Sequence, residues 1–313
     1  MKSYRALLVM LVATGAIWAC NKEDTDDDPA TPPDNTVFDA LFADNVADAR
    51  QAFALDAALG RQIIGAQGTR LHFQPGAFRH SDGTPVTGQV DVTVVEALTV
   101  GDMIWLNKQT VGNDNGTLRM LRSGGAINVT ASQNGSPLLI APGGLYVRIP
   151  TSVGDPAMQL FGGSEDADGR MIWNPIDSSV VTVEPVYIDL FYSFPADSMY
   201  WINCDQFYNY PDLTHITSTL PDGQSTDSTQ VWLAFPSENA VVQMPHSSGQ
   251  TYVTPPSYLG VPVGMQAVVV GLRMSTSGQY SSFTPVTISE NMTVPMTFAP
   301  TTLEEFEAAV NAL

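Results

Sequence analysis

The sequence contains few of the residues on which common enzyme chemistry depends. It has two cysteines, Cys20 and Cys204, and four histidines. A zinc site needs clustered nitrogen or sulfur ligands, and no second histidine or cysteine follows any histidine at the usual helical or strand spacings. The P-loop and the common hydrolase and protease motifs are also absent. We therefore expect a protein that is not an enzyme and that carries no cofactor.

Basic residues are scarce as well. The chain has 13 Lys and Arg against 32 Asp and Glu, which gives a net charge of −19. A surface of this sign repels phosphate backbones, so nucleic acid is excluded as a partner. Anionic lipid head groups are disfavoured as peripheral ligands for the same reason.

The sequence has no apolar run of the length that a membrane span needs. The charge-free residues 6–19 follow Lys2 and Arg5 and end against a dense acidic block. A spanning helix requires about 20 apolar residues. Residues 1–19 are therefore predicted to be an export signal that is cleaved.

Cys20 stands directly after this signal. Residues 17–20, "IWAC", resemble the lipobox of bacterial lipoproteins, in which the cysteine is acylated and becomes the new N-terminus. Two or more acyl chains give stable membrane attachment where one is marginal. The resemblance implies that Cys20 is lipidated and that acyl chains hold the protein to the membrane. The alternative is an ordinary secretory signal with an incidental cysteine.

The acidic residues after Cys20 form a tether. Lys22, Glu23 and Asp24 resemble the lipoprotein export signal of Bacteroidetes, which implies a lipid anchor in the outer membrane with the protein facing the cell exterior. The alternative is a solvated acidic spacer. On either interpretation residues 20–36 are too polar to offset their ordering entropy, and we expect a flexible segment.

The remaining chain alternates apolar and polar residues with period two, and turn signals rich in Gly, Pro, Asn and Asp separate the alternating stretches. Clear cases are residues 89–98, 125–132 and 144–150. Many short strands without intervening helical patterns are typical of sandwiches and barrels. The predicted fold is all-β, with two antiparallel β-sandwich domains, residues 37–190 and 191–313, divided near Pro195.

Helical patterns occur only at the two ends of this region. Residues 37–52 place apolar side chains three and four apart. At the C-terminus Thr302 and Glu305 make a capping box, and Phe306 and Val310 lie on one helix face. We expect the C-terminal helix to cover the last sheet.

Residues 65–78, "GAQGTRLHFQPGAF", resemble the opening of ZU5-like domains. The later stretches "LRSGGAINVTASQNG" and "YWINCDQFY" look like those of uncharacterised surface lipoproteins of Bacteroidetes. The resemblance implies a β-sandwich that mediates protein contacts and carries no chemistry. Leu71 and Phe73 would face the core, and Pro75 and Gly76 would form a turn. No functional residue is transferred by this likeness.

An aromatic stretch offers the most interesting candidate site, which consists of Tyr200, Trp201, Phe207 and Tyr208. Flat rings beside amide and carboxylate groups can bind a sugar. The alternative is that these rings pack in the core, which is the more common outcome.

Acidic residues give weaker candidates. Asp166 and Asp168 precede Gly169, a partial likeness to a calcium loop, although a hairpin turn is the simpler interpretation. Glu96, Glu184 and Asp189 could hide a glycosidase pair, against the simpler interpretation of strand-end and surface acids. Cys204 is expected to be a small buried hydrophobe.

The sequence thus predicts a cell-surface lipoprotein that binds, adheres or assembles with other envelope proteins. The alternative function is that of a carbohydrate-binding accessory in glycan uptake. Its ligand, its protein or glycan partner and its oligomeric state are not encoded in any motif that we can identify.

Overall fold

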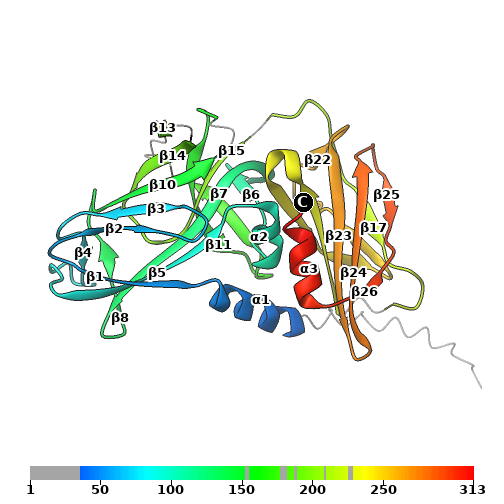
Figure 1. The fold of residues 1–313 in the computed structure, drawn as a ribbon. Helices are drawn as coiled ribbons and strands as arrows, with labels where there is room; N and C mark the ends of the chain where they lie inside the picture. Colours follow the sequence, from blue (N-terminus) through cyan, green and yellow to red (C-terminus); the bar gives the residue numbers. More distant parts are fainter. Residues whose placement is uncertain (1–35, 152–154, 177–181, 187–188, 208, 225–227) are drawn as a thin grey trace, which may run out of the picture. The chain divides into compact units, whose positions relative to one another are not determined.

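Strands dominate the computed structural model, as the alternating pattern predicts. The structure describes residues 36–313 except 152–154, 177–181, 187–188, 208 and 225–227 (Figure 1). The predicted signal, Cys20 and the acidic tether lie outside the described residues. Almost all strand pairs are antiparallel, and the all-β class is confirmed.

The first sheet has eight strands. Their order is β1 (Gln51–Asp56), β5 (Gln89–Ala97), β7 (Thr117–Gln133), β15 (Tyr200–Phe207), β11 (Gln159–Glu165), β12 (Met171–Pro175) and β6 (Val111–Asp114), with β8 (Ser136–Pro137) beside β7. Because β6 pairs with both β12 and β7, the strands β7, β15, β11, β12 and β6 close a ring. This ring encloses a separate apolar cluster that contains Phe161 and the fully buried Trp173.

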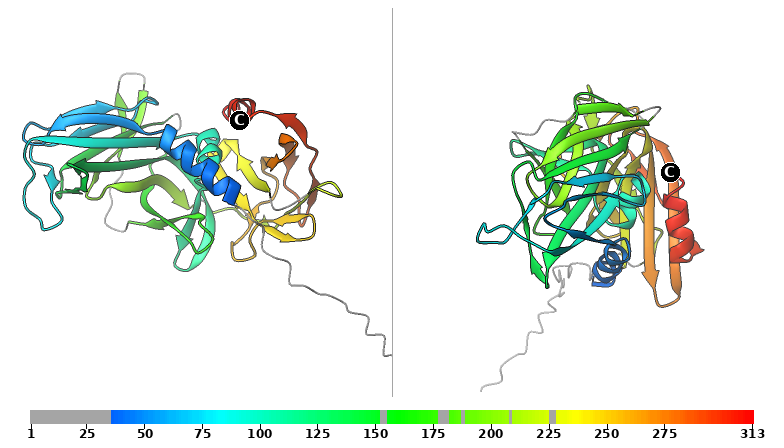
Figure 2. Two further views of the ribbon diagram at one scale, coloured as in Figure 1. Left: turned by 90° about the horizontal axis from the view of Figure 1, so that it is seen from below. Right: turned by 60° about the vertical axis from the view of Figure 1, so that its left-hand side comes forward.

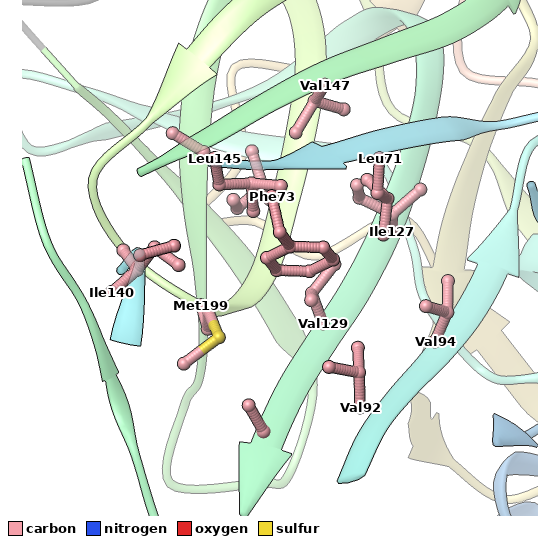
Figure 3. Packing of buried hydrophobic residues seen from close by; sticks show 14 of the residues in the cluster. Leu71, Phe73, Val92, Val94, Ile127, Val129, Ile140, Leu145, Val147 and Met199 are labelled. Atoms are coloured by element: carbon pink, nitrogen blue, oxygen red, sulfur yellow. The ribbon is translucent and has the colours of Figure 1, made fainter. Parts of the chain in front are cut away.

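A second sheet packs against β5 and β7 of the first sheet. Its strands are β13 (Thr182–Val186), β14 (Asp189–Ala196), β10 (Leu145–Thr151), β3 (Arg70–Phe73) and β2 (Arg61–Ile64). Figure 3 shows Leu71, Phe73 and Val147 of this sheet close to apolar side chains of β5 and β7. The inward residues of β5 and β10 alternate with more exposed ones, as the period-two pattern predicted. A two-stranded pair, β4 (Phe78–Arg79) and β9 (Leu139–Ile140), lies beside this core.

The strands after Phe207 form a second sandwich. Its five-stranded sheet is β19 (Ala240–Met244), β18 (Thr229–Phe235), β23 (Gln266–Ser275), β24 (Gly278–Thr287) and β26 (Ala299–Thr301). Its four-stranded sheet is β20 (His246–Ser248), β21 (Thr251–Val253), β17 (Thr217–Thr219) and β25 (Thr293–Pro295). One apolar cluster contains side chains of both sheets. The pair β16 (Leu213–Thr214) and β22 (Val261–Pro262) completes this part, together with the short 3-10 helix η1 (Pro236–Glu238).

Three helices cover the outer face of the five-stranded sheet (Figure 2). They are α1 (Thr36–Asp48), α2 (Val100–Trp105) and α3 (Leu303–Val310). The capping box of Thr302 and Glu305 is confirmed, and α3 covers the last sheet as expected. Helix α1 ends earlier than predicted, because Gln51 already pairs with Val94 of β5. Helix α2 was not predicted at all, although Thr99 and Asp102 form a capping box there too.

The predicted division between residues 190 and 191 falls inside β14. Strands β14 and β15 pair with strands of the first two sheets, so the change to the second sandwich comes after Phe207. Helix α1 was expected to belong with the first sandwich. Instead its Phe42 ring packs edge-on against Trp232 of β18, 6.0 Å between ring centroids. Contacts between residues far apart in the sequence thus determine both where the first sandwich ends and where α1 packs.

Across the described part of the chain, no helix has the length and apolar character that a membrane crossing requires.

Candidate functional site

Strand β15 carries the predicted aromatic site, and the structure separates its members. Trp201 and Phe207 both pack against the apolar cluster that contains Trp173. Tyr200 is 61% exposed and has a φ of 126°, in a region that side chains other than glycine rarely adopt. Tyr208 lies outside the described residues. Tyr192 and Phe194 of the same stretch are fully buried in the first sandwich.

Phe207 is a packing residue. Its ring meets Phe161 edge-to-face at 5.3 Å, and the guanidinium of Arg119 lies 5.4 Å from its centroid. Arg119 is held in turn by Asp114, 2.5 Å away. The core interpretation therefore holds for this ring.

Trp201 is different, because it is fixed in place and still half-buried. Its ring lies 6.5 Å from Trp173 in an edge-to-face arrangement. A Cβ atom on Gly163 would lie 2.8 Å from the Trp173 ring and 2.9 Å from the Trp201 Cβ. Only glycine on β11 leaves room for both indoles, so the sequence "FGGSE" positions Trp201.

A hollow of about 710 Å³ lies beside Trp201. We call it the Trp201 hollow, and its wall also includes residues of α1, the segment after α2 and the turn between β11 and β12. Its charged or polar lining residues are Asp39, Arg50, Asn107, Lys108, Glu165 and Asp168. This volume is in the range of small-molecule sites, in which a few polar groups fix the orientation of the ligand.

Lys108 is the best-positioned charge in the hollow. Its Nζ atom lies 5.4 Å from the Trp201 centroid and 3.3 Å from Oε1 of Glu165. The Lys108 side chain is only 11% exposed, whereas that of Glu165 is 57% exposed. The ammonium is thus held between a ring and a carboxylate, and Glu165 extends to solvent.

The turn with Asp166 and Asp168 belongs to the same hollow. Oδ1 of Asp166 accepts the N–H groups of Asp168 and Arg170, both at 2.9 Å. Arg170 then pairs with Asp166 at 3.0 Å and with Asp168 at 2.5 Å. The cation of this turn is an arginine of the chain itself, which supports the hairpin interpretation. In the described ranges no three His, Cys, Asp or Glu side chains gather as metal ligands.

The buried carboxylate of Glu96 has a structural task. It is 3% exposed and accepts the backbone N–H groups of Gln67 at 2.8 Å and Thr69 at 3.0 Å, and the side chain of Gln51 at 2.9 Å. A Cβ on Gly65 would lie 2.5 Å from this carboxylate. Glu96 therefore stands near the end of β5, in line with the strand-end interpretation, but it is buried and not on the surface. The side chains of Glu184 and Asp189 are outside the description.

A second hollow, of about 350 Å³, is lined by Arg122 and Glu238, two residues that sequence reasoning missed. Arg122 pairs with Glu238 at 2.7 Å and with Asp155 at 3.3 Å. The N–H of Ala157, then Gln206 and Arg122, hold the pKa of Asp155 below its usual value. Both acids are thus partners of one arginine, and its lowered pKa makes Asp155 a poor proton donor. Residues 116 positions apart form this group, so no local motif could reveal it.

The structure thus brings together two candidates that are 33 residues apart in the sequence, Trp201 and Asp168. Pairing of β11 with β15 places them together, with Gly162 opposite Ile202. Lys108 and Glu165 were not predicted as site residues, because neither stands in a motif. They reach the hollow through contacts between the segment after α2, strand β11 and strand β15.

Comparison with known proteins does not assign this site. No family model and no curated protein matches the chain. Among solved structures, that of gamma-CGTase from alkalophilic Bacillus clarkii is matched at 10% identity with a TM-score of 0.20, over 77% of this chain and 42% of that one. The chain spans less than half of that protein's length. A likeness of this size carries no argument about fold or activity.

Proposed function

We propose that this protein is a non-catalytic binding lipoprotein of the bacterial cell surface and that the Trp201 hollow binds a saccharide. The observation that carries the proposal is a rigidly held, half-buried indole in a hollow of about 710 Å³ with a charged rim. An indole face supplies apolar stacking area for a sugar ring, and the rim groups can bond to hydroxyls.

The state of the acids supports a role without catalysis. Around the Trp201 hollow Asp166 and Asp168 are paired with Arg170, and Glu165 with Lys108. Glycoside hydrolysis requires one protonated carboxylic acid with a raised pKa beside a second carboxylate. Each of the three carboxylates named here is instead engaged by a basic side chain of the protein itself.

The placement of the protein is proposed from the sequence. Acyl chains on Cys20 would anchor it in the outer membrane, and Lys22, Glu23 and Asp24 would direct it to the cell exterior. The ZU5-like resemblance of residues 65–78 supports a wider role in adhesion or envelope assembly. Saccharide binding and such a role are compatible in one surface protein.

The ligand is tested with the detergent-solubilised mature protein on an immobilised glycan panel. We expect Trp201→Ala to weaken retention of the bound glycan about 10- to 100-fold, the effect of losing one aromatic contact. Trp201→Phe should lose less, and Tyr200→Ala is the matched control, because Tyr200 is exposed but does not line the hollow. Wild-type protein that retains no glycan, or a Trp201→Phe and Trp201→Ala pair that binds as the wild type does, contradicts the saccharide assignment.

The anchor is tested separately in cells. Cys20→Ala should move the protein out of the envelope lipid fraction. Replacing Lys22, Glu23 and Asp24 with alanine should leave it lipidated but protected from protease added to intact cells. Full membrane retention of Cys20→Ala would exclude the anchor.

A further inference from the structure

Arg273 and two aromatic residues form a cluster on the second sandwich, and none of them lines the Trp201 hollow. Arg273 of β23 stands directly opposite Tyr280 of β24. Its Cζ atom is 4.3 Å from the Tyr280 ring centroid and 5.7 Å from that of Phe298. The guanidinium is therefore half-buried and stacked against two aromatic rings.

A glycine makes this arrangement possible. Gly271 lies two residues before Arg273, on the same face of β23. A Cβ atom at Gly271 would be 2.8 Å from Cζ of Phe298. Any other residue would displace the Phe298 ring from its place beside Arg273.

Arg273 differs in its charge balance from the half-buried cations Lys108, Arg122 and Arg170. Lys108, Arg122 and Arg170 each have a carboxylate oxygen within 3.3 Å. Among the described residues no carboxylate comes within ion-pairing distance of Arg273, and its buried Nε has no hydrogen-bond partner. Leaving a partly desolvated donor without an acceptor costs free energy, which a bound anion would offset.

Hydroxyl groups surround the ring that Arg273 stacks on. Tyr280 Oη lies 3.2 Å from Ser277 Oγ, which lies 2.9 Å from Ser275 Oγ. These hydroxyls are exposed at the tip of the β23–β24 hairpin. A ligand that reaches the guanidinium can therefore also meet a row of neutral hydrogen-bonding groups.

We propose that Arg273, with Tyr280 and Phe298, binds the carboxylate of an acidic sugar, such as a terminal uronic acid. The planar fork of arginine matches a carboxylate at two points, and the stacked rings hold the fork in place. The hydroxyls of Ser277 and Tyr280 bond to the hydroxyls of the same sugar. A chain of net charge −19 repels polyanions, so the ligand carries a single carboxylate.

The test measures binding to the full mature chain by calorimetry. The probe is an oligosaccharide of neutral sugars that ends in one glucuronic acid, and the matched control is the same compound ending in glucose. We expect the wild type to bind the acidic compound at least about 10-fold more tightly, and Arg273→Gln to remove that preference. Arg273→Lys should lose most of it, because a lysine keeps the charge but not the fork.

Arg61→Gln, at an exposed arginine of β2, is the control variant and should bind as the wild type does. Because the comparison of the two ligands uses unaltered protein, it remains decisive if a variant does not fold. Equal binding of the two ligands by the wild type overturns the proposal. So does binding that is equally tight with an acidic peptide.

Discussion

Asp205 is the most unusual single residue of the described chain. It is fully buried on β15, at the point where the register with β7 shifts. Asn203 donates to its Oδ2 atom at 2.6 Å, while Oδ1 has no hydrogen-bond partner. Burial raises the pKa of this carboxyl well above the usual value. The neighbouring Cys204 thiol is buried, as expected. Its pKa is raised, mainly by burial and to a smaller extent by the nearby Asp205.

The raised pKa predicts a specific dependence of stability on pH. Below pH about 4 the carboxyl is protonated in both the folded and the unfolded chain, so its ionisation does not change the free energy of unfolding. As the pH rises, the unfolded chain ionises freely while the folded chain holds its proton, so the free energy of unfolding falls. We expect Asp205→Asn to be more stable than the wild type at pH 7 to 8, with a difference that shrinks towards pH 4. Urea unfolding at several pH values measures this, and a difference that is constant with pH contradicts it.

Residue roles were predictable from the sequence only where neighbours along the chain decide them. The resemblance of residues 65–78 to ZU5-like domains implied inward positions for Leu71 and Phe73 and a turn at Pro75 and Gly76. In the structure both side chains are buried and Gly76 has a positive φ of 71°. Glu96 could not be understood in this way. Its partners are 27 to 45 residues earlier in the chain, and only the fold makes its carboxylate the acceptor for a turn.

At the scale of elements, α3 shows how a short helix is stabilised by what it covers. Its capping box satisfies the first N–H groups, which contributes about 1 kcal/mol. Its main contact is Phe306, whose ring lies 5.8 Å from Phe283 and 6.4 Å from Trp232. An eight-residue helix is not stable alone, so this packing must maintain it.

Phe306→Ala should therefore destabilise the protein by about 3–5 kcal/mol, the usual cost of removing a buried phenyl ring. The control Glu304→Gln changes an exposed side chain in the same helix and should stay within about 0.5 kcal/mol. Chemical denaturation followed by tryptophan fluorescence reports the difference. Equal midpoints for the two variants would mean that α3 does not support the sheet.

The strands were predictable as elements, but not their partners. Period two identifies a strand from its own residues. It does not reveal that β15 lies between β7 and β11, or that α1 packs against a sheet that begins nearly 200 residues later. For the same reason the predicted boundary between residues 190 and 191 falls inside β14. The Trp201 hollow depends on the same long-range pairings, so the sequence could name its tryptophan but not its wall.

At the scale of the whole molecule, a buried polar seam links the two sandwiches. Gln109, 3% exposed, donates to Met171 O at 3.0 Å and Tyr258 Oη at 2.9 Å and accepts from Gln243 N at 3.1 Å. Thr110 completes the seam. Its N–H donates to Val241 O and its Oγ1 accepts from Val241 N, each at 2.8 Å. This contact covers the edge of β19, which would otherwise be open to pairing.

We expect the described chain to unfold in one calorimetric transition because of this seam. Gln109→Leu removes the amide and leaves buried groups without partners, each at a cost of about 1–3 kcal/mol. The variant should melt at a lower temperature and with a broader or divided transition. Gln62→Leu, at an exposed position on β2, should melt as the wild type does. Two transitions already present in the wild type would show that the sandwiches unfold independently.

The attachment of α1 has a mechanical consequence for a protein anchored through Cys20, as proposed. Drag from the medium would pull on the N-terminal end of α1, which is held to the sheet by side chains such as Phe38 and Phe42. The next element, β1, is joined to β5 along a six-residue ladder. Tension should therefore release the helix first. The 13 residues of α1 span about 20 Å as a helix and about 45 Å when extended, so their release adds roughly 25 Å of length while every sheet stays intact.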